Sequence, residues 1–321
     1  MKIKRSNLIE PQRIQKLLSS EFALNLPLNV RLLRRGYNDT YLVENGSQRY
    51  VLRVYLNGKY YINDHNDFRW ELDLIQFLRK RGVPVSAPIP RSNGDSLGMM
   101  LWDNGEHYYA LFVYADGDPP RNASIAQATA LGNGLGQLHA VANEFRSKHK
   151  RYHLNLEFLI ERPMKLIREF FRRTGEPDSL APFLPRVETL VQKIRLWQTF
   201  ADEYGVIHGD PHVGNSHISA GNTVTIFDFD HGGYGWRAWD IATALRALPE
   251  EVRPNFRVAY ASQRPVSAEE WEMVSIFEKI RPIWDRGDVL AMDSIWEISE
   301  NPDTVQKRRI WLMEAFNKLL N

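Results

Sequence analysis

Residues 206–245 read VIHGDPHVGNSHISAGNTVTIFDFDHGGYGWRAWDIATAL, and this stretch decides the fold. Its apolar and β-branched runs predict three short strands, at Val206–His208, His217–Ser219 and Val224–Phe227. Polar side chains follow the first and last of these runs, because Asp210 lies just beyond one and Asp228 ends the other. Asn215 lies between them in the chain. We therefore expect polar groups to gather where the strands end.

These polar side chains are of the types that a phosphoryl transfer site needs. A carboxylate must orient the attacking hydroxyl, and oxygen ligands must hold the magnesium ion that neutralises the phosphates. We expect Asp210 to accept the hydroxyl proton, and Asn215 and Asp228 to bind Mg²⁺. Asp230 is a further candidate ligand, for a second magnesium ion. The residues thus predict an ATP- and Mg²⁺-dependent phosphotransferase that acts on a hydroxyl.

The order of these residues also resembles a known family. The pattern H-G-D-x-x-x-x-N followed by D-x-D is similar to that of the aminoglycoside phosphotransferase and choline kinase superfamily. The run from His212 to Asn215 resembles the H-x-G-N of stress-response kinase-like and homoserine kinase-like members. Gly209 stands where protein kinases carry an arginine that pairs with a phosphorylated loop, so we expect activity without such phosphorylation. The resemblance implies a bilobal, protein-kinase-like α+β fold.

The first part of the chain reads as a sheet with a helix against it. Three β-rich runs between Asn29 and Tyr55 are separated by the turn-forming segments 36–39 and 45–47. A helix follows, because apolar residues recur at helical spacing, at Phe68, Leu72, Ile75 and Leu78. Two further strands, at Gly98–Asp103 and Tyr108–Tyr114, complete a predicted five-stranded sheet. We assign residues 1–114 to an N-terminal, nucleotide-covering lobe.

Residues 115–321 then form the predicted C-terminal lobe, which is mostly helical and carries the catalytic and acceptor-binding residues. A helix beginning near Ser124 has an apolar stripe, and the segment Gly232–Gly235 is expected to form a turn after the metal-binding aspartate. Asp240 is expected to be a buried brace in the helix that follows.

The family resemblance also implies which residues contact the nucleotide. Gly36, Asn38 and Thr40 belong to the segment that resembles the nucleotide-covering hairpin. Arg53 stands where a lysine is usual, with Glu71 as its partner on the helix. Phe112 and Val113, within Leu111–Ala115, would be the hinge whose backbone holds the adenine.

Composition excludes other classes of protein. The 321 residues carry 41 basic and 39 acidic side chains, a net charge of +2 that gives no general bias toward nucleic acids or membranes. The absence of cysteine excludes disulfides and thiolate chemistry. The basic tract from Arg146 to Arg195 reads as amphipathic helices with solvated faces. With no apolar run long enough to span a bilayer, we expect a cytoplasmic protein that binds neither nucleic acid nor membrane.

The sequence leaves three functions open. The first is a kinase for a small hydroxyl-bearing molecule, the second a stress-response-type serine/threonine protein kinase, and the third a nucleotide-binding regulator without turnover. A zinc hydrolase is disfavoured, because Pro211 interrupts any helix that would carry both His208 and His212. The sequence predicts neither the acceptor nor the oligomeric state.

Overall fold

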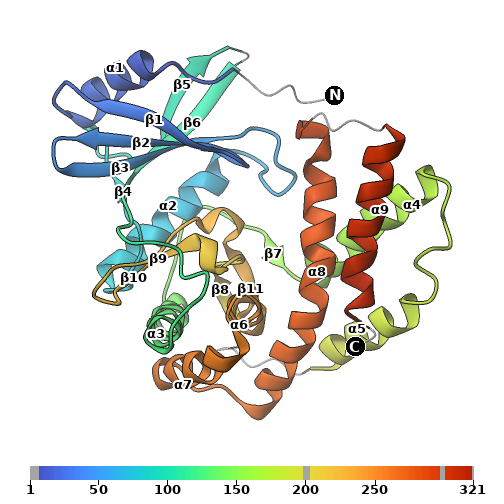
Figure 1. The fold of residues 1–321 in the computed structure, drawn as a ribbon. Coiled ribbons are helices and arrows are strands. Elements are labelled where there is room, and N and C mark those ends of the chain that lie inside the picture. The colour runs from blue at the N-terminus through green and yellow to red at the C-terminus, as the bar shows by residue number, and fades with distance from the viewer. Residues whose placement is uncertain (1–6, 104, 198–202, 297–300, 320–321) are drawn as a thin grey trace.

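The computed structural model describes residues 7–103, 105–197, 203–296 and 301–319, and its ribbon has two lobes (Figure 1). An antiparallel sheet with two helices forms the N-terminal lobe, and helices dominate the C-terminal lobe. This architecture confirms the predicted bilobal α+β fold. Among the described residues, no helix is both long enough and apolar enough to cross a membrane.

The sheet of the N-terminal lobe has the strand order β1-β2-β3-β6-β4, and β5 pairs with β6. Its strands are β1 (Asn29–Arg35), β2 (Asn38–Asn45), β3 (Gln48–Tyr55), β4 (Pro88–Ile89), β5 (Gly98–Trp102) and β6 (Gly105–Val113). Asn45 pairs with Gln48 across a tight turn in which Gly46 has φ +60°, as the turn-forming sequence predicts. The predicted sheet was one strand short, because β4 has only two residues and shows no alternation.

Two helices pack on this sheet, and only the second was predicted. Helix α1 (Pro11–Phe22) buries Ile14, Leu18 and Phe22, which recur every four residues along one face. Helix α2 (His65–Lys80) begins with a capping box, in which Asp64 and Asp67 each accept a backbone N–H. This cap fixes the first turn of α2 and so the position of the buried Glu71 one turn later.

The C-terminal lobe is built from helices around two small sheets. Its helices are α3 (Ile125–Ala142), α4 (Arg162–Arg173), α5 (Leu184–Leu196), α6 (Arg237–Arg246), α7 (Arg253–Gln263), α8 (Ala268–Trp296) and α9 (Pro302–Asn317). Helices α3 and α7 pack closely because α3 presents glycines to its partner. A Cβ on Gly132 would lie 2.4 Å from the Phe256 carbonyl oxygen, and one on Gly136 2.8 Å from that of Tyr260. The glycines therefore set the distance between the helices.

The three short strands predicted in this lobe are present as β8 (Tyr204–Ile207), β9 (Ser216–Ile218) and β10 (Val224–Ile226). Strands β9 and β10 form one pair, and β7 (His153–Leu154), β11 (Gly233–Trp236) and β8 form a second sheet. The prediction of a turn at Gly232–Gly235 was wrong, because most of that segment is strand β11. Its glycines provide room instead, since a Cβ on Gly235 would lie 2.6 Å from the Ile207 side chain.

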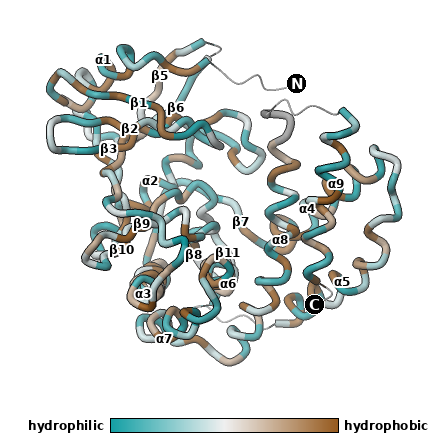
Figure 2. Tube along the Cα trace, in the orientation of Figure 1, coloured by the Kyte–Doolittle hydropathy of each residue, from teal (hydrophilic) through white to brown (hydrophobic). Residues whose placement is uncertain are grey.

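The long helix α8 runs along the side of the C-terminal lobe, and apolar positions recur along it (Figures 1 and 2). It packs against α4 and α6. Gly287 permits the first contact, because a Cβ there would lie 2.4 Å from Pro163 Cα. This close packing fixes the position of α8, whose polar face lies toward the loop after β8.

Candidate active site

The loop after β8 is held by its backbone, which places Asp210 at the strand end. Gly209 has φ +84°, and a Cβ there would lie 2.2 Å from the carbonyl oxygen of His231. No larger residue fits, so the arginine of protein kinases is sterically excluded. As predicted, Asp240 is a buried brace in α6, and its carboxylate accepts the N–H groups of His208 at 2.7 Å and Gly209 at 2.9 Å.

His208 ties this loop to the neighbouring strand. Its Nε2 lies 3.0 Å from the carbonyl oxygen of Phe227, and the N–H of Asp210 donates to its Nδ1 at 3.3 Å. A neutral ring with the proton on Nε2 satisfies both contacts. Burial lowers the pKa of His208 to about 4, so the ring is neutral at physiological pH. His208 is thus a fixed part of the loop.

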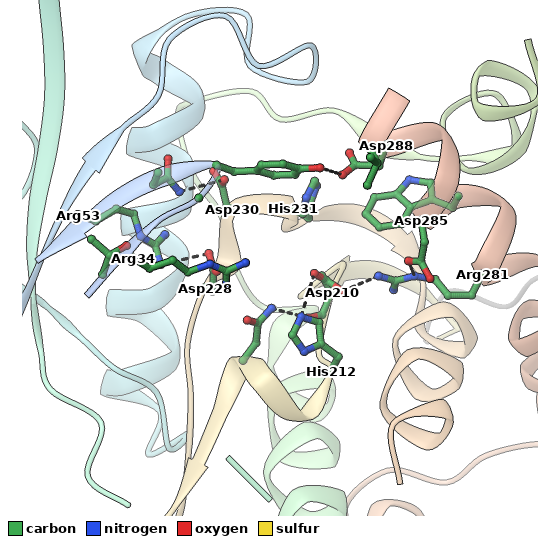
Figure 3. A pocket seen from close by; sticks show the side chains of 17 residues that line it. Arg34, Arg53, Asp210, His212, Asp228, Asp230, His231, Arg281, Asp285 and Asp288 are labelled. Atoms are coloured by element: carbon green, nitrogen blue, oxygen red, sulfur yellow. Dashed lines mark hydrogen bonds and ion pairs between the residues drawn. The ribbon is translucent and has the colours of Figure 1, made fainter. Parts of the chain in front are cut away.

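Asp210 points into a pocket between the lobes (Figure 3). Burial alone would raise the pKa of its carboxyl, and this effect is outweighed chiefly by Arg281, so the pKa lies below its ordinary value. One oxygen, Oδ1, accepts from Arg281 Nη2 at 2.5 Å. The other, Oδ2, lies 3.6 Å from His212 Nε2. Asp210 is therefore an ionised acceptor beside the cavity.

Asn215 and Asp228 line the same pocket and present oxygen atoms to it. The side-chain N–H of Asn215 donates to the Asp210 carbonyl at 2.9 Å, which orients the amide and leaves its oxygen for another partner. Asp228 has φ +69°, and its side chain is 36% exposed. The described part of the chain holds no cluster of three His, Cys, Asp or Glu side chains suited to a metal. Two protein oxygens suit magnesium, which usually completes its shell with phosphate and water.

Arg53 lines the pocket and pairs with Glu71, the residue predicted to be its partner. Its Nη1 lies 2.7 Å from Glu71 Oε1, and its Nη2 lies 3.2 Å from Asp228 Oδ1. Burial raises the pKa of Glu71, and the adjacent Arg53 opposes this shift. The guanidinium therefore connects helix α2 to the strand end that carries Asp228.

The other residues predicted to contact the nucleotide fall into two groups. Gly36, Asn38 and Thr40 line the pocket with Arg53. Phe112 and Val113 do not belong to this lining. The N–H of Val113 donates to the Ala87 carbonyl at 3.0 Å, and its own carbonyl accepts from the Ser86 hydroxyl at 2.6 Å. The backbone N–H and carbonyl of Val113 therefore hydrogen-bond to the segment that precedes β4.

Asp230 forms an ion pair across the two lobes. Lys59, in the segment after β3, donates to both carboxylate oxygens of Asp230 at 2.8 Å and to Asn38 Oδ1 at the same distance. The Tyr61 hydroxyl donates to Asp230 at 3.0 Å. Burial would raise the pKa of Asp230, and Lys59 outweighs that effect and lowers it. Lys59 thus occupies both oxygens that a second magnesium ion would use, and sequence reasoning had not identified it.

Helix α8 supplies the far side of the pocket, and none of its residues was predicted from the sequence. Arg281, Trp284, Asp285 and Asp288 line the cavity of about 280 Å³. Asp288 accepts a hydrogen bond at 2.6 Å from the Tyr37 hydroxyl, which comes from the N-terminal lobe. The sequence does carry a pattern for these residues. The last three follow Arg281 by three, four and seven positions, so all four share one face of the helix.

Comparisons with known proteins show what this chain is similar to. The model of the phosphotransferase enzyme family matches residues 29–272. A protein of Deinococcus radiodurans is 32% identical over 88% of this chain and 82% of its own. A homoserine kinase of Phenylobacterium zucineum is 26% identical over 86% of this chain and 78% of its own. Among solved structures, a microcompartment-associated aminopropanol kinase has a TM-score of 0.76 at 23% identity, covering 96% of this chain and 95% of that one.

Proposed function

Because the chain belongs to the phosphotransferase enzyme family, as its sequence pattern predicted, we propose that it transfers the γ-phosphate of ATP to a hydroxyl of a small molecule. The observation that carries this proposal is the convergence of Asp210, Asn215, Asp228 and Arg53 on one pocket between the lobes. Relatives whose names specify a homoserine or aminopropanol substrate support a small acceptor over a protein.

The residues divide the reaction between the two sides of the pocket. On the acceptor side, Asp210 receives the hydroxyl proton through Oδ2 as the new oxygen–phosphorus bond forms and the bond to the β-phosphate oxygen breaks. On the nucleotide side, Arg53 binds phosphate oxygens, and Gly36, Asn38 and Thr40 cover them. The product nucleotide is ADP. The residues proposed to bind the phosphates of ATP belong to the N-terminal lobe, residues 1–114, and the proposed base belongs to the C-terminal lobe, residues 115–321.

Magnesium fits the oxygen atoms of Asn215 and Asp228, and when bound it neutralises the charge of the phosphates. Asp230 is already paired with Lys59, so we propose that the protein provides ligands for one magnesium ion. Calorimetry tests the metal assignment: Asp228→Asn is expected to abolish Mg²⁺-dependent binding of a nucleotide. Unaltered affinity in this variant contradicts the assignment.

Turnover is tested with γ-labelled ATP and Mg²⁺ against a panel of hydroxyl metabolites, including amino alcohols and hydroxy amino acids, and against a generic protein substrate. Asp210→Asn is the control, because it keeps the side-chain shape and removes the base. We expect transfer to a small molecule that falls by at least about a hundredfold in this variant. Equal turnover by wild type and Asp210→Asn refutes the role of Asp210, and transfer to the protein alone refutes the acceptor class.

A further inference from the structure

Arg281 lies in contact with the proposed base although it belongs to a distant helix. It is on α8, 71 residues after Asp210, and its Nη2 donates to Asp210 Oδ1 at 2.5 Å. Its Nε donates to Asp285 Oδ1 at 2.7 Å, and its Nη1 donates to the Thr243 hydroxyl at 2.5 Å. Each nitrogen of the guanidinium therefore has its own partner.

The surroundings of Arg281 hold the guanidinium in one place. Its carbon lies 5.0 Å from the centre of the Trp239 ring and 4.4 Å from that of Trp284. The side chain is only 5% exposed. Burying a cation is costly unless it is paired, and here Asp210 and Asp285 both compensate. A guanidinium has five N–H donors and the three contacts use one each, so one further N–H remains on each of Nη1 and Nη2, and Arg281 is one of the residues that line the cavity.

The pocket thus has an arginine at each end. Arg53 lies beside Asp228 on the nucleotide side, and Arg281 lies beside Asp210 on the acceptor side, with the two carboxylates between them (Figure 3). The oxygen of the acceptor hydroxyl must lie within hydrogen-bond reach of Asp210, about 2.6–3.2 Å. The phosphorus becomes bonded to that same oxygen, which brings the phosphoryl oxygens into the neighbourhood of Arg281.

We propose that Arg281 binds the transferred phosphoryl group on the acceptor side and holds Asp210 in line with the acceptor hydroxyl. This inference rests on the phosphotransferase function proposed above. The ligand of Arg281 is the phosphate monoester formed on the acceptor, and a guanidinium is well suited to phosphate oxygens.

The charges balance during this step. Before transfer, the carboxylate of Asp210 is the anion at Nη2 of Arg281, and that of Asp285 is the anion at Nε. The acceptor O–H bond breaks and its proton moves to Asp210, while the oxygen–phosphorus bond forms, the bond to the β-phosphate oxygen breaks and ADP leaves. The new phosphate monoester then replaces Asp210 as the anion beside Nη2, and Asp285 stays at Nε. Arg281 therefore has an anion beside Nη2 both before and after transfer, without moving from its place between the tryptophans.

The experiment compares Arg281→Gln and Arg281→Lys with the wild type and with Arg286→Gln. Arg286 is a matched control, because it lies on the same helix, stacks on Trp311 at 4.2 Å and does not line the pocket. Inorganic phosphate is the probe, titrated into the protein with ADP and Mg²⁺ and followed by phosphorus NMR. Hydrolysis of ATP to ADP is measured in parallel, since water replaces the acceptor there.

We expect Arg281→Gln to weaken the binding of inorganic phosphate at least about tenfold and to lower kcat about a hundredfold, with affinity for a non-hydrolysable ATP analogue within about twofold. Arg281→Lys should be intermediate in both, because an ammonium keeps the charge and loses the planar fork. Arg286→Gln should match the wild type. If Arg281→Gln fails to fold, Arg281→Lys decides by the same two readouts.

Unchanged phosphate affinity in the Arg281 variants overturns the inference, and leaves the residue as a brace for Asp210 alone. A wild type that does not bind inorganic phosphate overturns it too. The phosphate titration needs no turnover, so failure of this inference is distinct from failure of the proposed function, which appears as equal turnover by wild type and Asp210→Asn.

Discussion

Replacing Lys59 by methionine is expected to destabilise the protein strongly, because it leaves a buried carboxylate without its cation. The side chain of Lys59 is fully buried, and that of Asp230 is 5% exposed. After the change, the hydrogen bonds that remain to the Asp230 carboxylate from described residues come from the Tyr61 hydroxyl at 3.0 Å and the Asn38 amide at 3.2 Å. Removal of one partner from a buried ion pair typically costs about 3–5 kcal/mol. We expect a loss near the lower value, because His231 and Arg53 also favour the ionised carboxylate.

The measurement is a double-mutant cycle in which urea unfolding is followed by tryptophan fluorescence. Asp230→Asn alone should cost less than Lys59→Met, because burial already lowers the pKa of Lys59 and the amine can release its proton. The double variant, Lys59→Met with Asp230→Asn, should recover at least about 2 kcal/mol relative to the sum of the single losses. The exposed Lys16→Met on α1 is the control and should unfold like the wild type. A loss below about 1 kcal/mol in Lys59→Met, or additive losses in the double variant, refutes the reasoning.

The remaining predictions concern the loop after β8. Gly209→Ala should cost at least about 3 kcal/mol of stability and most of the turnover, because its Cβ would lie 2.2 Å from the His231 oxygen at a φ of +84°; a variant that unfolds within about 1 kcal/mol of the wild type contradicts this. Asp240→Asn should lower stability by about 1–3 kcal/mol, since an amide cannot accept both backbone N–H groups with its single oxygen, and normal unfolding together with normal kcat would exclude that role. The buried, neutral ring of His208 should make the free energy of unfolding fall as the pH drops. This contribution, about 3 kcal/mol, is complete above the unfolded-state pKa of about 6.5 and is lost as the pH falls toward the folded-state pKa of about 4. The free energy of unfolding of His208→Gln should therefore depend less on pH between 7 and 4 than that of the wild type.

The part of the site whose residues lie close together in the chain was predicted from the sequence. Asp210, Asn215 and Asp228 lie within 19 residues, and the strand runs around them fix how they meet. Arg53 and Glu71 were also predicted as a pair, through the family resemblance, and they lie 2.7 Å apart. The first group was predictable because its residues are separated by few positions in the chain, and the second because its pattern resembles that of a known family.

The parts that the sequence did not reveal depend on tertiary packing. Arg281 reaches Asp210 because of the position of α8, which is set by contacts such as that between Gly287 and Pro163. Lys59 reads as a surface lysine in a turn, and only the closure of the two lobes shows that it is buried against Asp230. Local periodicity carries no information on such long-range contacts.

The hydrogen bond between Tyr37 and Asp288 has a thermodynamic consequence. Tyr37 lies between Gly36 and Asn38 in the segment proposed to cover the nucleotide, and Asp288 lines the side of the pocket proposed for the acceptor. A ligand that shifts either partner therefore changes the free energy of the other ligand's site. Binding free energies are reciprocal, so the factor by which ATP changes the affinity for the acceptor must equal the factor by which the acceptor changes the affinity for ATP. The two substrates are thus expected to bind as a coupled pair, through Asp288 and the hydroxyl groups of Tyr37 and Tyr60 that donate to it.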